Sequence, residues 1–185
     1  MTVTYLHEPA LDTAADDPAP ESADVETLLL CALLFAGHTT AAEITALLEV
    51  ADFHDPLHAE LFEAMAALSA AGQPHDPAMV LTHLERHGLL AGHHGSRLAY
   101  ALTGATTAGA DPTSALYYAH AVVSAAYRRS FRKAGAAITD AAETLPEHEL
   151  FEHLLTIGYA QRAATRRLDR FRALIGAAPA VGVTE

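Results

Sequence analysis

The residues of this sequence that could do chemistry are mainly its histidines, of which there are 12 in 185 residues. His83 and His87 are four residues apart, so on a helix their imidazoles share one face and could supply two ligands to a zinc ion. His93 and His94 follow nearby, but the spacing places no third ligand. We therefore expect a solvated polar face here and no bound metal.

A second candidate is the dipeptide His54-Asp55, which is typical of HD-type metal-dependent phosphohydrolases. A site of that type also needs a further His upstream and a further Asp downstream, and His38 and Asp111 are available for those roles. Asp55, however, is followed by Pro56, and an acid before proline is a typical helix start in which the carboxylate accepts a backbone N–H. A small His/Asp hydrolase is therefore the alternative function, and helix capping is the preferred role of Asp55.

Other signatures of catalysis are weak. Cys31 is the only cysteine, and its place beside an apolar helix stripe predicts a small buried hydrophobe rather than a nucleophile. The phosphate-binding pattern G-x-x-x-x-G-K-[ST] does not occur in this sequence, and the only lysine, Lys133, falls within a predicted helix. We therefore expect no catalytic residue, no cofactor, no metal and no ATPase activity.

The elements that must position these residues are predicted to be helices. Alanine accounts for 41 of the 185 residues, whereas aromatic residues make up only 6%. Alanine is the best helix former because it loses no side-chain entropy, and the β-branched and aromatic residues that favour strands are scarce. The composition therefore predicts an all-α fold class. No apolar run approaches the roughly 20 residues of a membrane span, so we expect a soluble, cytoplasmic protein with no membrane partner.

Acid–proline pairs mark three helix starts in this sequence. The pairs are Asp55-Pro56, Asp76-Pro77 and Asp111-Pro112. We predict a compact helical bundle over residues 23–110, followed by a long antiparallel helical hairpin over residues 111–176 that turns at Leu145-Pro146. Residues 1–22 are acidic and interrupted by prolines, with little to bury, and residues 177–185 are similar. Both ends are therefore predicted to be disordered tails.

The last predicted helix carries an apolar stripe with the alternating four- and three-residue spacing of a coiled coil, interrupted by Gln161. Its large apolar members are Leu150, Leu154, Ile157, Leu168, Phe171 and Ile175. A stripe of about 30 residues is about 45 Å long, which exceeds the reach of a bundle of this size. We predict that the hairpin protrudes and that the stripe is the interface of a homo-oligomer. The alternative is that both helices pack on the bundle of their own chain.

The net charge of −12 is unevenly distributed, because no Lys or Arg precedes Arg86. The bases gather where the hairpin should join the bundle, whereas its tip is acidic. Arginines of this cluster are Arg128, Arg129, Arg132, Arg162, Arg166 and Arg167. A solvated face that balances the acidic bundle is the simplest interpretation. The functional candidate is a partner-docking surface, and a DNA-contacting patch is a further alternative. An acidic protein with a pI near 5.3 is expected to bind nucleic acid weakly or not at all.

Residues 52–58 read DFHDPLH and are followed by LFEA, and they are one of six short segments that share a family pattern. The six keep their order and together resemble the N-terminal domain of DnaB-type replicative helicases, in which this segment reads DFY-x-P-x-H…IFEAI. The other segments are Glu26 to Phe35, Gly72 to Asp76, Leu84 to Leu90, Tyr117-Tyr118-Ala119 and Tyr127-Arg128-Arg129. The sequence departs from the family at Asp55, where a basic or polar residue is usual, and at Gly92-His93-His94-Gly95, where the family has a Gly-Gly loop.

The resemblance implies a small helical globule followed by a hairpin, with hairpins pairing between subunits to build the collar of a hexameric ring. It also implies candidate partners, namely further copies of the chain, a primase, a helicase loader or a full-length DnaB-type helicase. The family's ATPase domain does not occur in this sequence. We therefore expect a stand-alone, non-catalytic interaction and oligomerisation module linked to DNA replication, acting in primosome or helicase assembly or its regulation.

Overall fold

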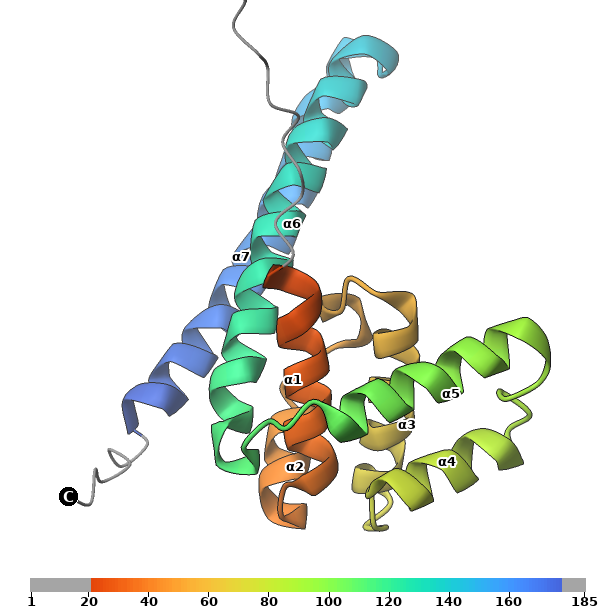
Figure 1. The fold of residues 1–185 in the computed structure, drawn as a ribbon. Helices are drawn as coiled ribbons and strands as arrows, with labels where there is room; N and C mark the ends of the chain where they lie inside the picture. Colours follow the sequence, from red (N-terminus) through yellow and green to blue (C-terminus); the bar gives the residue numbers. More distant parts are fainter. Residues whose placement is uncertain (1–20, 178–185) are drawn as a thin grey trace, which may run out of the picture.

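The computed structural model describes residues 21–177, which are built from helices without any strand (Figure 1). The elements in chain order are α1 (Glu21–Phe35), α2 (His38–Thr45), the 3-10 turn η1 (Val50–Asp52), α3 (Pro56–Ala70), α4 (Pro77–Arg86), α5 (Gly92–Thr107), the 3-10 turn η2 (Pro112–Ser114), α6 (Ala115–Thr144) and α7 (Glu147–Ala177). The predicted all-α fold class is confirmed. None of the described helices is long and apolar enough to cross a membrane.

Helix α1 forms the centre of the globular part. Its residues 29–34 are all at least 97% buried, on every side of the helix, and α1 packs against α3, α5 and α6. A helix that is apolar all round must be surrounded by other elements. Helices α3, α5 and α6 therefore surround α1, and α2 and α4 pack outside them against α3. Leu61, Met65 and Leu98 are among the side chains that α3 and α5 contribute to the core.

The predicted acid–proline helix starts are present in the structure. Asp55 caps α3 by accepting the backbone N–H of Leu57 at 2.8 Å, and Asp76 caps α4 by accepting the N–H of Ala78 at 3.0 Å. Asp111 accepts the N–H of Thr113 at 2.8 Å and begins η2, which leads directly into α6. Hydrogen bonding from Thr113 lowers the pKa of the Asp111 carboxyl below its ordinary value, because it favours the charged form.

Helices α6 and α7 run antiparallel and form the predicted hairpin. The Tyr127 and Thr165 hydroxyls lie 3.0 Å apart, and the Ser130 hydroxyl donates to the side-chain oxygen of Gln161 at 3.0 Å. Gln161 in turn donates to the Ser130 carbonyl at 3.1 Å, so the residue that interrupts the apolar stripe provides a polar lock between the two helices. The end of the hairpin that carries the turn protrudes from the globular part (Figure 1).

The other end of the hairpin is part of the globular core. Leu168 and Phe171 of α7 are 2% and 0% exposed and belong to the same buried cluster as Val122 and Val123 of α6 and the leucines of α1. The core therefore crosses the boundary predicted between residues 23–110 and residues 111–176. The predicted disordered tails lie outside the described residues, except for their inner ends, which belong to α1 and α7.

Candidate functional site

The outer part of the hairpin carries exposed apolar side chains, which we call the apolar face. Its members are Phe131 and Ile138 of α6, which are 50% and 43% exposed, and Phe151 and Leu154 of α7, which are 65% and 46% exposed. The Ser130–Gln161 contact sets the register that places Ile138 level with Leu154. Phe131 follows Ser130, which contacts α7, by one residue, and Phe151 follows the half-buried Leu150 by one residue. Such residues lie on the same side of an antiparallel pair, because both helices are right-handed and run in opposite directions.

The structure divides the predicted oligomer stripe into a buried part at the bundle and a more exposed part on the protruding hairpin. Leu168 and Phe171 are buried within their own chain, so their assignment to an exposed seam is corrected. They lie where α7 crosses the bundle, and the core of the bundle covers them. Leu150, Ile157 and Ile175 are partly buried, and Leu154 is 46% exposed. The predicted interface left out Phe131, Ile138 and Phe151. Ile138 belongs to the apolar stripe predicted for the first hairpin helix, and its seven-residue spacing from Phe131 is a signal that could have added Phe131.

A buried polar node fastens the hairpin to the globular part. Asp52 of η1 is 1% exposed, and its carboxylate lies 2.6 Å from the guanidinium of Arg167 of α7. Arg167 also pairs with Glu49 at 2.7 Å, and Arg129 of α6 donates to the Asp52 carbonyl. Both arginines that reach η1 therefore come from the hairpin, one from each helix. Their predicted place on a free docking surface is corrected, because the node engages both side chains.

The Asp52 carboxyl balances opposing effects. Burial raises its pKa above 3.8, because desolvation disfavours the charged form. The backbone N–H of Glu49, which donates to the carboxylate at 2.8 Å, and the positive charge of Arg167 both act in the opposite direction. The ion pair with Arg167 thus offsets part of the cost of burying the Asp52 carboxylate at the point where η1 meets the hairpin.

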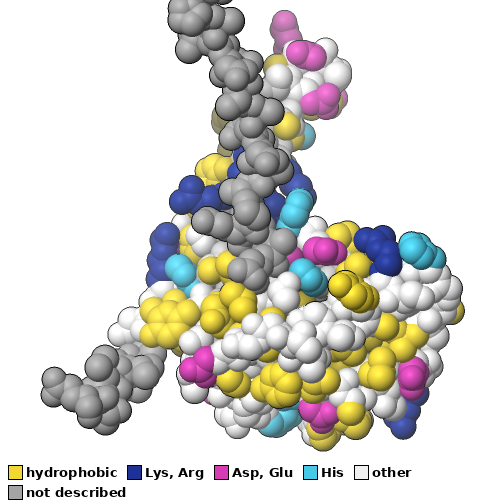
Figure 2. Space-filling model, viewed as in Figure 1, with side chains coloured by type: hydrophobic (Ala, Val, Ile, Leu, Met, Phe, Trp, Pro, Cys, Tyr) yellow, Lys and Arg dark blue, Asp and Glu magenta, His cyan; other side chains and the backbone are white. Residues whose placement is uncertain are grey.

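Arg172 pairs with Asp169 on the same helix, and we call the other bases of the hairpin the basic surface. It consists of Arg128, Arg132, Lys133, Arg162, Arg166 and Arg170. Of these, Lys133 lies at the edge of the node, where it lines the same pocket as Asp52 and Arg167. All six are exposed, and no hydrogen bond or ion pair links them to another residue within 21–177. Figure 2 shows Lys and Arg side chains gathered where the hairpin leaves the globular part. Of the predicted docking arginines, Arg128, Arg132, Arg162 and Arg166 therefore remain available to a partner.

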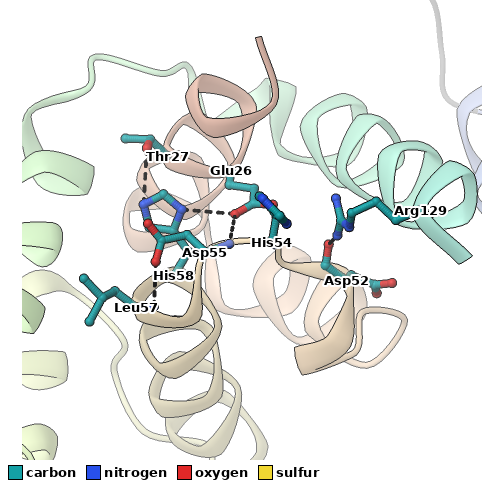
Figure 3. Close-up of polar contacts among 8 residues, drawn as sticks. All are labelled: Glu26, Thr27, Asp52, His54, Asp55, Leu57, His58 and Arg129. Carbon is teal, nitrogen blue, oxygen red and sulfur yellow. Dashed lines mark hydrogen bonds and ion pairs between the residues drawn. The ribbon is translucent and has the colours of Figure 1, made fainter. Parts of the chain in front are cut away.

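The His54-Asp55 dipeptide lies in a structural node rather than in a metal centre (Figure 3). Glu26 of α1 is 2% exposed and accepts the backbone N–H of His54 at 2.6 Å and that of Asp55 at 3.2 Å. Its carboxylate also lies 3.1 Å from Nδ1 of His58, whose Nε2 faces the Thr27 hydroxyl at 3.5 Å. One buried carboxylate thus holds the start of α3 against α1.

The other candidate metal ligands do not converge on this node. His38 lies at the start of α2, where its ring centroid is 6.2 Å from that of His75. The rings of His83 and His87 lie 4.1 Å apart on α4, and Nδ1 of His87 is 2.8 Å from the carbonyl of His83. Burial and, next, the charges of His87 and Arg86 lower the pKa of His83. Over residues 21–177 no group of three His, Cys, Asp or Glu side chains is placed to hold a metal ion.

The chain is similar to known proteins in both sequence and structure. Residues 18–124 match a family model described as "DnaB-like helicase N terminal domain". The structure is similar to the crystal structure of the N-terminal domain of DnaB helicase from Mycobacterium tuberculosis, with a TM-score of 0.66 and 24% sequence identity. That match covers 75% of this chain and 96% of the other. No curated protein sequence matches the chain.

Proposed function

The chain belongs to the family of DnaB-like helicase N-terminal domains, and on this premise we propose that it is a non-catalytic interaction and oligomerisation module of the DNA-replication machinery. The observation that supports this proposal best is the apolar face. Four large apolar side chains, each at least 43% exposed, share one side of a protruding hairpin. Large apolar side chains that are exposed on one side of a hairpin favour burial against a partner.

We infer that the partner of the apolar face is a second copy of the chain. The four side chains of the face are uncharged, so their contact with a second copy buries no charge of their own. A hairpin surface also suits self-association, because the same patch on two copies can pair around a two-fold axis. The homo-oligomer predicted from the stripe is therefore retained, but its interface moves from Leu168 and Phe171 to the outer half of the hairpin.

The basic surface is proposed as the docking site for a replication partner, namely a primase, a helicase loader or a full-length DnaB-type helicase. Unpaired arginines at the foot of a protruding hairpin are accessible to acidic side chains of such a protein. Opposite charges across an interface mainly raise the association rate, and salt screens them. We propose that the protein acts in the cytoplasm, where these partners would be met.

The oligomer is tested by light scattering on the full chain at tens of micromolar. Phe151→Glu places a charge on the apolar face, at its end nearest the turn, and should shift the protein toward monomer. Tyr100→Glu is the matched control, because Tyr100 is an 81% exposed aromatic residue on α5 of the globular part. A wild-type monomer, or equal effects of both substitutions, contradicts the proposed interface.

The docking surface is tested by titrating labelled protein with a purified primase, loader or helicase from the same cell. Arg162→Glu with Arg166→Glu should weaken binding, and rising salt should slow association. Arg86→Glu with Arg97→Glu reverses two exposed arginines of the globular part and provides the matched control. Binding that is unchanged by the hairpin pair would place the docking site elsewhere.

A further inference from the structure

The basic surface lies close to the place where the described structure begins. Glu26 is bonded to His54, and Asp52, two residues earlier, is bonded to Arg129 and Arg167 of the hairpin. Glu21, the first residue of α1, precedes Glu26 by five residues, or about 7.5 Å of helix. Figure 1 shows this end of α1 beside α6, at the level where the hairpin leaves the globular part.

The residues that precede α1 have the opposite charge. Residues 1–20 contain four acids, Glu8, Asp12, Asp16 and Asp17, and no Lys or Arg. The farthest of these acids, Glu8, is 13 residues before Glu21, and a chain of that length reaches up to about 45 Å. The six bases of the basic surface occupy only residues 128–133 of α6 and 162–170 of α7. The longer of these two stretches spans about 12 Å of helix, so every acid of the segment can reach them.

We propose that residues 1–20 bind the basic surface of their own chain and compete there with other acidic or polyanionic ligands. The two parts are complementary, because the surface holds six bases without partners and the segment holds only acids among its strongly charged residues. Direct attachment gives such a segment an effective concentration on the order of millimolar, so that weak, screened contacts suffice. Competition with a docking partner rests on the proposed function of the basic surface. The contact between residues 1–20 and the basic surface does not rest on it.

A second copy could offer the same acids, and the geometry favours the segment of the same chain. The segment leaves α1 within a few residues of the node that anchors the hairpin, so no further assembly is needed to bring the charges together. Arg162, Arg166 and Arg170 recur every four residues and lie along one side of α7, which gives an extended chain a row of sites to follow.

Photo-crosslinking of the full chain tests the contact directly. A photoreactive benzoylphenylalanine replaces Tyr5, and crosslinked peptides are mapped in an equal mixture of unlabelled and isotope-labelled protein. The expected crosslinks join the segment to residues 128–133 or 162–170 of the same chain at low salt. They should disappear at ~1 M salt, where the Debye length falls to ~3 Å. Crosslinks elsewhere, crosslinks between differently labelled chains, or crosslinks unaffected by salt overturn the proposal.

Competition is tested with a short single-stranded oligothymidine as a polyanionic probe. One variant neutralises the four acids of the segment (Glu8→Gln, Asp12→Asn, Asp16→Asn, Asp17→Asn). The control neutralises four exposed acids without ion pairs (Glu43→Gln, Glu63→Gln, Glu85→Gln, Glu143→Gln), so both variants carry the same net charge.

The segment variant should bind the probe about threefold more tightly than the control, as expected if the segment covers the surface two-thirds of the time. Equal affinities of the two variants show an effect of net charge alone and overturn the proposal. Neither readout depends on the oligomer or on a replication partner, so failure here is distinct from failure of the proposed function.

Discussion

The inner and outer halves of α7 carry similar apolar residues at similar spacing, yet they have different surroundings. Phe171 in the inner half is 0% exposed, because the bundle covers it, whereas Phe151 in the outer half is 65% exposed. The same contrast separates Leu168, at 2%, from Leu154, at 46%. Periodicity therefore defines which side of a helix is apolar, and the place of the helix in the fold decides whether that side stabilises the monomer or remains available to another copy.

The largest expected effect comes from deleting the same side chain in each half. Phe171→Ala should lower the free energy of unfolding by about 3–5 kcal/mol, because it leaves a cavity in a closed core. Phe151→Ala should change the stability of the monomer by no more than about 0.5 kcal/mol. Denaturant unfolding followed by circular dichroism, at concentrations below self-association, measures both. Similar losses for the two variants would show that the outer half is covered within the chain.

A second comparison concerns two adjacent arginines. Arg167→Ala removes the partner of the buried Asp52 carboxylate and should cost about 3 kcal/mol, near the lower end for a broken buried pair because Arg167 is 20% exposed. Arg166→Ala removes an exposed, unpaired charge and should leave stability within about 0.5 kcal/mol. Thermal unfolding of both variants provides the measurement. A stable Arg167→Ala variant would mean that the node does not fasten the hairpin.

The same node predicts a pH dependence. Burial raises the pKa of Asp52 above 3.8, so the folded state holds this proton more tightly than the unfolded state. The stability that protonation contributes is present below pH 3.8 and is lost as the pH rises through the higher folded pKa. Relative to Asp52→Asn, the wild type should therefore lose stability across that interval, by at most about 1.4 kcal/mol per pH unit.

Unfolding curves of the two proteins at closely spaced pH values above 3.8 measure this difference. A wild type that gains stability relative to Asp52→Asn over the same interval would show that the charge of Arg167 outweighs burial.

The smallest effect is expected for nucleic acid binding by the basic surface at the foot of the hairpin. The chain has a net charge of −12, so single-stranded DNA should bind with a Kd near or above ~10⁻⁵ M at physiological salt. Arg162→Glu with Arg166→Glu should weaken that binding further, whereas Arg86→Glu with Arg97→Glu should affect it less. Fluorescence anisotropy measures these affinities. Submicromolar binding by the wild type would make the basic surface a DNA site in its own right.

Much of the fold could be predicted from local signals in the sequence. Acid–proline pairs determine the starts of α3, α4 and η2, because the carboxylate and the fixed proline backbone act within a few residues. Leu145-Pro146 determines the turn of the hairpin, and the alanine-rich composition determines the fold class. The order of the DnaB-like segments determined the family, since each segment keeps its own short pattern.

Only the tertiary structure decided which of these residues make contacts within the chain and which remain exposed. Arg166 and Arg167 are adjacent in sequence, but only Arg167 meets the buried carboxylate of Asp52, 115 residues away. Leu154 and Leu168 belong to one stripe, but only Leu168 lies against the bundle. Glu26 became a buried acceptor because α3 begins beside α1. Such contacts join distant parts of the chain, and short-range periodicity carries no information about which distant element covers a given face.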